Sequence, residues 1–253
     1  MSAYSGELRK LTSLPSVWAA FAVGIAVPAV VGVLSAVSTS AAIANGTKPE
    51  AGPDLGYQEL AFGVAGAIIL GVVAASSEYF TEGESAGSGR QITTSLTAVP
   101  SRTRFLLAKV AALTTAVVLM SAIATGITLS CVQAVVGDHA HALDGAAATR
   151  VPGVVLYWVL TALLAFGITL LTRNGVVPLA VLVLNTSVVT VTFLLSKVTP
   201  LAVYFPDLAG MRMFLTEVRV PVELSPITGG VVMAVWVVLL LACGFTAFTR
   251  RDA

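Results

Sequence analysis

Six long apolar stretches, separated by short polar segments, dominate this chain of 253 residues. Each stretch is close to the roughly 20 residues that a helix needs to cross the hydrocarbon core of a bilayer. Only 11% of the residues are charged and 57% are hydrophobic, which leaves too little polar surface for a water-soluble globule. We therefore predict an all-α membrane protein, residues 1–253 forming one domain. The predicted spans are about 17–42, 60–77, 105–136, 152–172, 175–196 and 227–248.

The basic residues near the span ends predict the orientation, because loops rich in Lys and Arg stay on the cytoplasmic side. Six spans place both termini on one side. If the termini are cytoplasmic, the inner segments hold nine basic and five acidic residues, whereas the outer segments hold five basic and eight acidic ones. We therefore predict a multi-pass protein of the cytoplasmic membrane with both termini inside. The net charge of +1 gives no reason to expect nucleic-acid binding.

Residues 1–16 predict a short amphipathic helix on the inner membrane surface. Its apolar residues recur at helical spacing and its charged residues occupy another face. The apolar positions are Tyr4, Leu8, Leu11 and Leu14, and the charged positions are Glu7, Arg9 and Lys10. We expect this interfacial helix to anchor the chain laterally before the first span.

The polar segment 78–109 is the only sizeable polar segment through which a partner protein could act on the predicted helix bundle. Residues 91–99 can form a short helix with Ile92, Leu96 and Val99 on one face, and Ser101 can cap the helix that becomes the third span. Such a helix is suited to docking onto another protein. The alternative is a solvated loop whose arginines only fix the topology. We expect the basic residues of 102–109, including Lys109, to seat the third span at the inner surface.

Small residues recur every four positions in the second predicted span, at Gly63, Ala67, Gly71 and Ala75. Such a ridge lets another helix approach closely in lipid, where hydrophobic association between helices is weak. The first interpretation is packing within the chain. The second makes Gly63, Ala67 and Gly71 candidates for a subunit interface.

Hydroxyl and amide side chains line faces of two other predicted spans. Hydroxyl groups in membrane helices often donate to a carbonyl of their own helix, and this is the first interpretation. The second is that these side chains line a translocation path. The candidates for that path are Asn185, Thr186, Thr190, Thr192, Ser196 and Thr125.

The sequence lacks the common catalytic and nucleotide-binding motifs. No lysine ends a phosphate-binding Gly-rich loop, and no span holds a deep acidic residue of the kind that ion-driven carriers use as a relay. His139 and His141 in a short acidic loop could contact a metal, but closed metal sites show more ligands at fixed spacing. We therefore predict no catalytic, cofactor-binding or metal-binding residues. If the chain moves a molecule, the energy should come from a partner.

Three short stretches, in a fixed order relative to the spans, resemble a known family. They are Glu7-Leu8-Arg9-Lys10-Leu11 before Trp18, then Glu78-Tyr79 with residues 91–102 and Ala108-Lys109, and finally Leu224-Ser225-Pro226 with Gly229 and Arg250-Arg251-Asp252. With these motifs the chain resembles the permease subunits of type 2 ATP-binding-cassette (ABC) exporters, which include drug, polysaccharide and lantibiotic-immunity exporters of bacteria. Its alanine-, valine- and glycine-rich composition is similar to that of actinobacterial proteins.

The resemblance implies a coupling helix at 91–99 that contacts a separate ATPase subunit, on which ATP and Mg would bind. It also implies that residues 4–14 form the connecting helix of the family and that 200–226 form an outer re-entrant segment. A second permease, identical or paralogous, would complete the transporter. The implied ATPase-coupling residues are Glu78, Glu84, Arg90, Gln91, Ile92, Leu96, Val99 and Arg102. Because the link at 80–88 is longer than is usual in the family, either Glu78 or Glu84 could hold its acidic position.

The leading hypothesis is therefore an export permease for a hydrophobic or amphipathic substrate, such as a drug, a peptide antibiotic or a lipid-like molecule. In this hypothesis the chain is not an enzyme by itself, because ATP hydrolysis takes place on the partner. One alternative is a membrane sensor or scaffold that transports nothing. The other is an intramembrane enzyme, which would need a nucleophile or a carboxylate pair at membrane depth.

Overall fold

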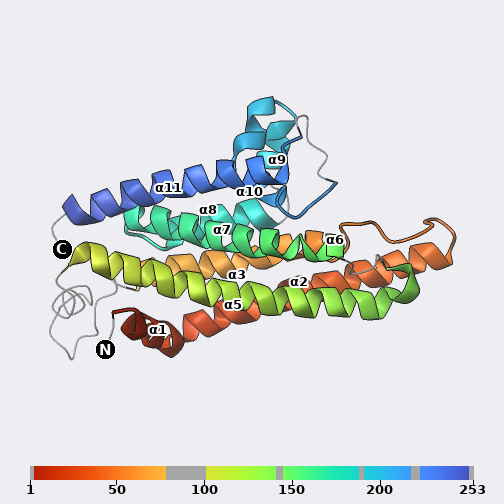
Figure 1. Ribbon diagram of the computed structural model, residues 1–253, viewed down its shortest axis with the longest axis horizontal. Coiled ribbons are helices and arrows are strands. Elements are labelled where there is room, and N and C mark those ends of the chain that lie inside the picture. The colour runs from red at the N-terminus through yellow and green to blue at the C-terminus, as the bar shows by residue number, and fades with distance from the viewer. Residues whose placement is uncertain (1–2, 78–100, 141–144, 188–190, 218–222, 251–253) are drawn as a thin grey trace.

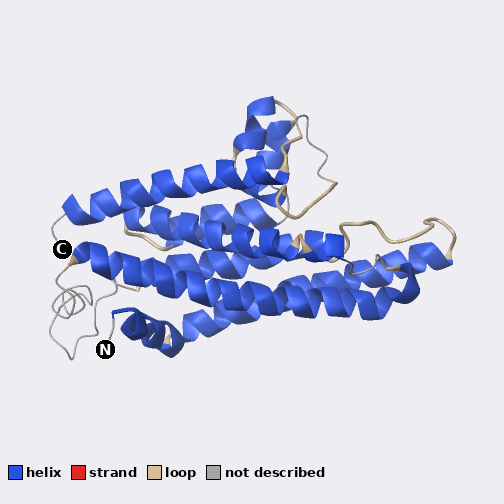
Figure 2. Cartoon of the chain, in the orientation of Figure 1, coloured by secondary structure: helices blue, strands red, loops and turns tan. Residues whose placement is uncertain are grey.

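The computed structural model describes residues 3–77, 101–140, 145–187, 191–217 and 223–250. Every regular element in these ranges is a helix (Figures 1 and 2). Five helices are long and apolar enough to cross a membrane: α2 (Pro15–Ala44), α3 (Tyr57–Ser76), α5 (Arg102–Val136), α7 (Val151–Thr172) and α11 (Pro226–Arg250). They confirm five of the predicted spans and identify a multi-pass membrane protein.

The stretch 175–196, predicted as one span, differs from the other five. It contains α8 (Val176–Ser187) and α9 (Val191–Ser196), and residues 188–190 between them lie outside the described ranges. A 12-residue helix such as α8 is about 18 Å long. Because the hydrocarbon core is about 30 Å thick, neither helix crosses it alone.

The remaining elements are short. The chain begins with α1 (Ala3–Ser13), and the connection from α5 to α7 contains a 3-10 turn, η1 (Gly137–His139), and α6 (Gly145–Ala148). The stretch predicted as re-entrant contains η2 (Pro200–Tyr204) and α10 (Pro206–Met211). The predicted coupling helix at 91–99 lies outside the described residues.

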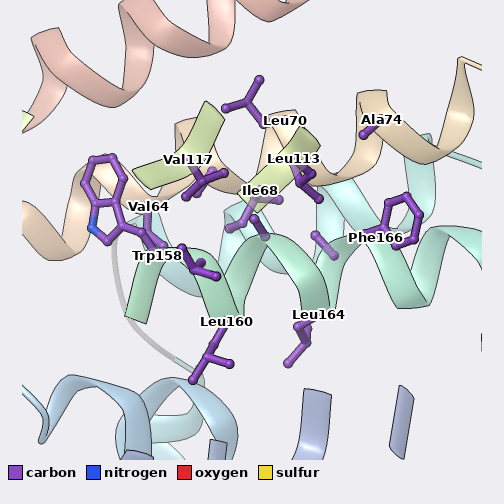
Figure 3. Packing of buried hydrophobic residues seen from close by; sticks show 14 of the residues in the cluster. Val64, Ile68, Leu70, Ala74, Leu113, Val117, Trp158, Leu160, Leu164 and Phe166 are labelled. Carbon is purple, nitrogen blue, oxygen red and sulfur yellow. The ribbon is translucent and has the colours of Figure 1, made fainter. Parts of the chain in front are cut away.

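Helices α3 and α7 form the centre of the bundle and are the most deeply buried of the long helices. Helices α2 and α5 pack on one side of this pair, and α11 packs on α7 from the other side (Figure 1). The main hydrophobic cluster joins Ile68 and Leu70 of α3, Leu113 and Val117 of α5, and Trp158 of α7 (Figure 3). The outer faces of α2, α5 and α11 leave apolar side chains exposed, as expected for helices in lipid.

The small-residue ridge of α3 packs inside the chain. A Cβ added at Gly71 would lie 2.2 Å from the Ala162 carbonyl oxygen, and one at Gly63 would lie 2.6 Å from the Trp158 ring. Ala67 is fully buried as well. The ridge therefore permits close contact between α3 and α7, which is the first of the two interpretations of the pattern.

The bundle has two ends, which we name after one residue at each. At the Arg102 end, Arg102 Nη1 donates to the Phe248 carbonyl oxygen at 3.3 Å, so the start of α5 meets the end of α11. At the Asp54 end, the start of α7 meets the segments before α3 and after α10, through Asp54 and Arg150. The N-terminal end of α1 and the C-terminal end of α11 both lie near the Arg102 end (Figure 1).

The amphipathic helix predicted at residues 1–16 is present as α1, and it packs on α5. Glu7 Oε2 accepts a hydrogen bond from Lys109 Nζ at 2.8 Å, and the hydroxyl groups of Tyr4 and Thr115 are 3.0 Å apart. The Lys109 side chain is only 3% exposed, because its acidic partner on α1 lets the ammonium group be buried. The expectation that the basic residues of 102–109 seat the third span at the inner membrane surface stays a prediction.

Candidate functional site

A cavity of about 600 Å³ lies among α3, α7, α8, α9, α10 and α11. Its walls are mainly aliphatic, formed by Ile68, Leu164, Ile168, Val181, Met233 and Leu240. The polar groups on the walls are few: Tyr157 and Thr161 of α7, Thr192 of α9 and Asp207 of α10. A largely apolar cavity with a few convergent polar groups is the usual form of a small-molecule site.

Helix α7 provides the long wall of this cavity. From Tyr157 to Ile168 it extends over about 16 Å, which is half or more of the membrane core. The Thr161 hydroxyl donates to the Tyr157 carbonyl oxygen at 2.8 Å, so its hydrogen is used within the helix and its oxygen remains an acceptor.

Helix α10 fits tightly between α7 and α11, and this contact places Asp207 on the cavity wall. A Cβ at Gly210 would lie 2.5 Å from Met233 Sδ and 2.6 Å from the Tyr157 ring. Only glycine allows so close an approach. Because Asp207 lies in the first turn of the same short helix, its carboxylate position depends on this packing.

Aromatic rings border the part of the cavity nearest α10. The rings of Phe205 and Trp236 stack with centroids 6.2 Å apart, and Trp236 Nε1 donates to the Tyr204 carbonyl oxygen at 2.9 Å. Phe205 and Trp236 are 41% and 39% exposed, and Val181 on α8 is 61% exposed. The cavity therefore reaches the surface of the chain between α8 and α11.

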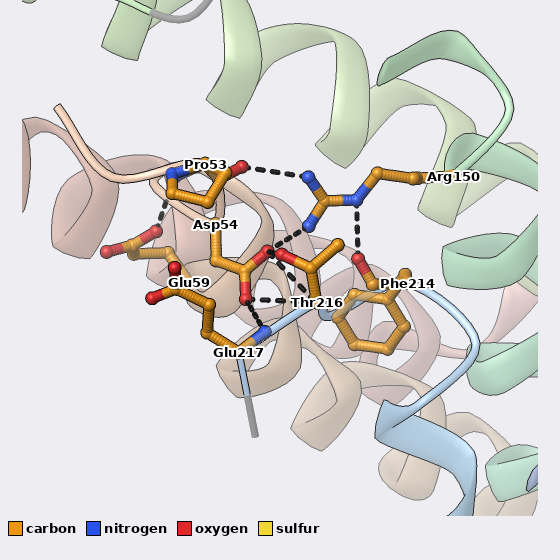
Figure 4. Close-up of polar contacts among 8 residues, drawn as sticks. Pro53, Asp54, Glu59, Arg150, Phe214, Thr216 and Glu217 are labelled. Carbon is orange, nitrogen blue, oxygen red and sulfur yellow. Dashed lines mark hydrogen bonds and ion pairs between the residues drawn. The ribbon is translucent and has the colours of Figure 1, made fainter. Parts of the chain in front are cut away.

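A polar cluster at the Asp54 end holds the segment after α10 in place (Figure 4). The Asp54 carboxylate accepts hydrogen bonds from the Thr216 hydroxyl at 2.7 Å, from the Thr216 amide at 3.0 Å and from the Glu217 amide at 2.8 Å. It also accepts one from Arg150 Nη2. We call Asp54, Arg150, Thr216 and Glu217 the Asp54 cluster.

Arg150 links the Asp54 cluster to two backbone segments. Its Nε donates to the Phe214 carbonyl oxygen at 2.7 Å and its Nη1 to the Pro53 carbonyl oxygen at 2.8 Å (Figure 4). The guanidinium carbon lies 3.9 Å from the centre of the Tyr57 ring, in cation–π geometry. One side chain therefore joins the starts of α3 and α7 to the segment that follows α10.

The Asp54 cluster changes the acidity of its carboxyl group. Burial acts to raise the pKa of Asp54, but the hydrogen bonds from Glu217 and Thr216 and the charge of Arg150 act in the opposite direction. The net result is a pKa below the usual value of 3.8. Asp54 is therefore ionised at neutral pH.

A second cavity, of about 580 Å³, lies at the Arg102 end. It lies where α3 ends and the chain enters the segment 78–100, and its wall includes Leu14, Ser76, Ser77, Arg173 and Asn174. Arg173 ends α7 in the left-handed conformation, with φ of 52°. The cavity thus joins the α1–α2 junction, the end of α3 and the α7–α8 turn.

The predicted coupling residues are only partly described. Arg102 is the first residue of α5 and contacts Phe248, as given above. Glu78, Glu84, Arg90, Gln91, Ile92, Leu96 and Val99 lie outside the described residues.

The predicted path residues lie in different environments. Thr192 is buried and lines the larger cavity, whereas Ser196 is buried elsewhere in α9. Thr125 is buried in α5 and has no hydrogen-bond partner within the described ranges. Asn185 and Thr186 belong to α8, but their side chains are not described, and Thr190 lies outside the described residues. The three subunit-interface candidates, Gly63, Ala67 and Gly71, are buried in α3 within the chain.

Sequence reasoning missed Asp207, Tyr157 and Thr161, and also the pairing of Asp54 with Arg150. The available signals were weak: Asp54 and Arg150 each come just before a predicted span, and Asp207 follows a proline in the outer segment. No group of three or more His, Cys, Asp and Glu side chains able to hold a metal occurs in the described part of the chain, and His141 falls outside it. Comparison with protein-family models, with curated proteins and with solved structures found no match.

Proposed function

We propose that the chain is the membrane-spanning subunit of a bacterial exporter that a separate ATPase subunit drives. The main support is the cavity bounded by α3, α7, α8 and α11, which lies between helices that could cross a membrane and borders exposed apolar side chains. Its aliphatic walls and few polar groups suit a hydrophobic or amphipathic substrate. The family resemblance supplies the direction of transport and the source of energy.

In this proposal the stretch 175–196, which contains α8 and α9, is the sixth crossing. Arg173, before α8, lines the cavity at the Arg102 end, and Phe214, after α10, contacts Arg150 at the Asp54 end. The chain therefore moves from one end of the bundle to the other between these two residues. With six crossings the termini share one side, and the Arg102 end, which holds most of the predicted inner basic residues, is cytoplasmic.

The ATPase would dock at the Arg102 end, through the predicted helix at 91–99. The two sides of this segment attach to described elements, since Ser77 follows α3 and Ser101 caps α5. Helix α1 is bound to α5 by the Glu7–Lys109 ion pair, so it would move with α5. ATP and Mg would bind to the ATPase alone, and a second permease would complete the complex.

The Asp54 cluster would act at the outer side in this proposal. It fixes the segment after α10, and α10 forms one wall of the cavity beside α7 and α11. Displacement of this segment would open the cavity outward. The chain itself would not be an enzyme, and the alternatives of a sensor, a scaffold or an intramembrane enzyme predict no ATP-dependent transport.

Transport by inside-out vesicles from the native host tests this proposal. Vesicles that contain the chain and its partners should accumulate at least one member of a panel of fluorescent amphiphiles when ATP is added. A non-hydrolysable ATP analogue or deletion of the chain should abolish this accumulation. Ile92→Asp and Leu96→Asp should abolish it too, whereas Thr94→Asp, on the opposite predicted helix face, should not. Equal accumulation with and without the chain, across the panel, would contradict the proposal.

A further inference from the structure

We infer that the larger cavity binds an uncharged ligand with a hydrogen-bond acceptor group, and that the Tyr157 hydroxyl donates a hydrogen bond to that group. This inference rests on the proposed function in one respect, since it names the class of substrate that the same cavity would carry. It depends on which polar groups of the cavity wall already have partners, and it places no charge of the ligand beside Asp207.

Tyr157 brings a buried hydrogen-bond donor to the cavity. Its side chain lines the cavity, and the residue is only 1% exposed. Its hydroxyl makes no hydrogen bond to any residue that the structure describes. Buried polar groups in folded proteins are nearly always paired, because an unpaired one loses its hydrogen bonds to water and gains none in return. The hydroxyl therefore offers a ligand a donor that is already desolvated.

The other hydrogen-bonding side chains of the described wall are occupied. The Thr161 hydroxyl donates to a carbonyl oxygen of its own helix at 2.8 Å, and Trp236 Nε1 donates to a carbonyl oxygen of η2 at 2.9 Å. Thr192 and Asp207 also have interaction partners. On this wall, Tyr157 is thus the donor that a ligand can use without breaking an existing contact.

The Tyr157 ring is held in place by its neighbours. Its centroid lies 5.3 Å from that of the Phe214 ring, and a Cβ at Gly210 would lie 2.6 Å from the Tyr157 ring. Phe214 is itself fixed, because its carbonyl oxygen accepts a hydrogen bond from Arg150. A donor that is held in one position loses little conformational entropy when a ligand binds, so the site is pre-organised.

The rest of the wall suits an uncharged, hydrophobic ligand body. Leu164 and Ile168 lie two to three helical turns further along α7, toward the Arg102 end, and Leu240 of α11 lines the same cavity. A charge without a counter-charge is costly in such surroundings. Asp207 is the only residue with a formal charge on the described wall, and it already has a partner. The ligand therefore carries an acceptor near one end and an apolar body within about 600 Å³.

A contact within the protein is the competing explanation for Tyr157. Asp207 is close enough to interact with Tyr157 electrostatically, so a small side-chain movement could let its carboxylate accept the hydroxyl hydrogen. Such a role predicts that loss of the hydroxyl lowers stability, and it predicts no effect of an acceptor on the ligand. The experiment therefore has to compare two ligands that differ only in the acceptor.

Saturable binding to the purified chain in nanodiscs, with no ATPase present, tests the inference. The probes are benzophenone and diphenylmethane, which are uncharged and similar in shape, and of which only benzophenone has a carbonyl acceptor. Empty nanodiscs correct for partition into lipid. We expect benzophenone to bind about three- to tenfold more tightly. In Tyr157→Phe the two affinities should agree within about twofold. Tyr204→Phe, which removes a phenol hydroxyl outside the cavity wall, should keep the preference.

The infrared carbonyl stretch of bound benzophenone gives a second readout, which a purely structural role of Tyr157 would not change. A hydrogen bond lowers its frequency, so the stretch should lie lower in the wild-type protein than in Tyr157→Phe or in lipid.

Several results would overturn the inference. These are no saturable benzophenone binding, equal binding of the two probes to the wild type, a carbonyl stretch unchanged from that in lipid, or an unchanged preference in a Tyr157→Phe variant that keeps its melting temperature. The proposed function can fail separately. Acceptor-selective binding without ATP-driven transport would contradict the proposed function alone, whereas ATP-driven transport without acceptor-selective binding would contradict the inference alone.

Discussion

The Arg150 guanidinium donates a hydrogen bond to the Asp54 carboxylate, 96 positions earlier in the chain, and a second one to the Phe214 carbonyl oxygen. Two segments that are far apart in sequence are therefore fixed to the start of α7 by one side chain. Both charged side chains are largely buried, at 15% and 11% exposure. The free-energy cost of burying the two charges is offset by their mutual attraction and by the additional hydrogen bonds that each side chain makes.

Replacement of Arg150 by Ala should destabilise the protein strongly. It leaves the Asp54 carboxylate buried without its cation, a change that costs about 3–5 kcal/mol in proteins. Thermal unfolding in detergent, followed by loss of monodispersity, measures the effect. Lys48→Ala is the matched control, because Lys48 is an exposed cation in the connection before α3. Equal melting temperatures for the two variants would contradict the assigned role of Arg150.

The contribution of Asp54 to the stability of the folded protein should be lost only as the pH falls into the acidic range. Because the pKa of the folded state lies below the usual 3.8, folding favours the ionised form. The stabilisation is complete above pH 3.8 and is lost as the pH falls through the lower pKa of the folded state. The difference in melting temperature between wild type and Asp54→Asn should therefore stay constant from neutral pH to about pH 4 and shrink below it. A difference that disappears already near pH 6 would contradict this assignment.

The Glu7–Lys109 pair should hold α1 on α5. Lys109→Met removes the charge from a nearly fully buried position and leaves Glu7 without its partner. We expect the amides of α1 to exchange with solvent about tenfold faster or more in a hydrogen-exchange experiment. Arg9→Met serves as the control, since Arg9 is exposed on the same helix. Unchanged exchange of α1 in Lys109→Met would show that the pair does not hold the helix.

Two glycines in apolar helices should respond differently to a methyl group. Gly71→Ala would place Cβ 2.2 Å from the Ala162 carbonyl oxygen, and such overpacking costs about 1–3 kcal/mol. Gly126→Ala has open space around the added carbon and should be neutral or stabilising. Melting temperatures of the two variants test whether α3 and α7 pack within one chain. If Gly71→Ala is as stable as Gly126→Ala, this close contact is absent.

The sequence was informative where one physical requirement dominates. Length and hydrophobicity predicted the five long helices, because a membrane permits few other structures. Ser101 was also predicted correctly as a cap, and its Oγ accepts from the Arg104 amide at 3.4 Å. Both patterns are local, so a single segment contains the whole signal.

Features that depend on distant contacts could not be predicted in the same way. The pairing of Lys109 with Glu7 joins residues 102 positions apart, and charge counting placed both only on the inner side. Asp207 reaches the cavity because Gly210 lets α10 approach Tyr157, and neither residue signals that contact in the sequence. The stretch 175–196 has the composition of a span, and the described parts of it are α8 and α9.

We propose above that a separate ATPase drives this chain. The most direct test is to purify the tagged chain from its native membrane into nanodiscs and to measure ATP hydrolysis. The proposal predicts a stoichiometric ATPase subunit and an activity that Ile92→Asp with Leu96→Asp removes and Thr94→Asp retains. If the wild-type chain, purified in mild detergent after cross-linking in the membrane, contains no ATPase subunit and hydrolyses no ATP, the claim is contradicted.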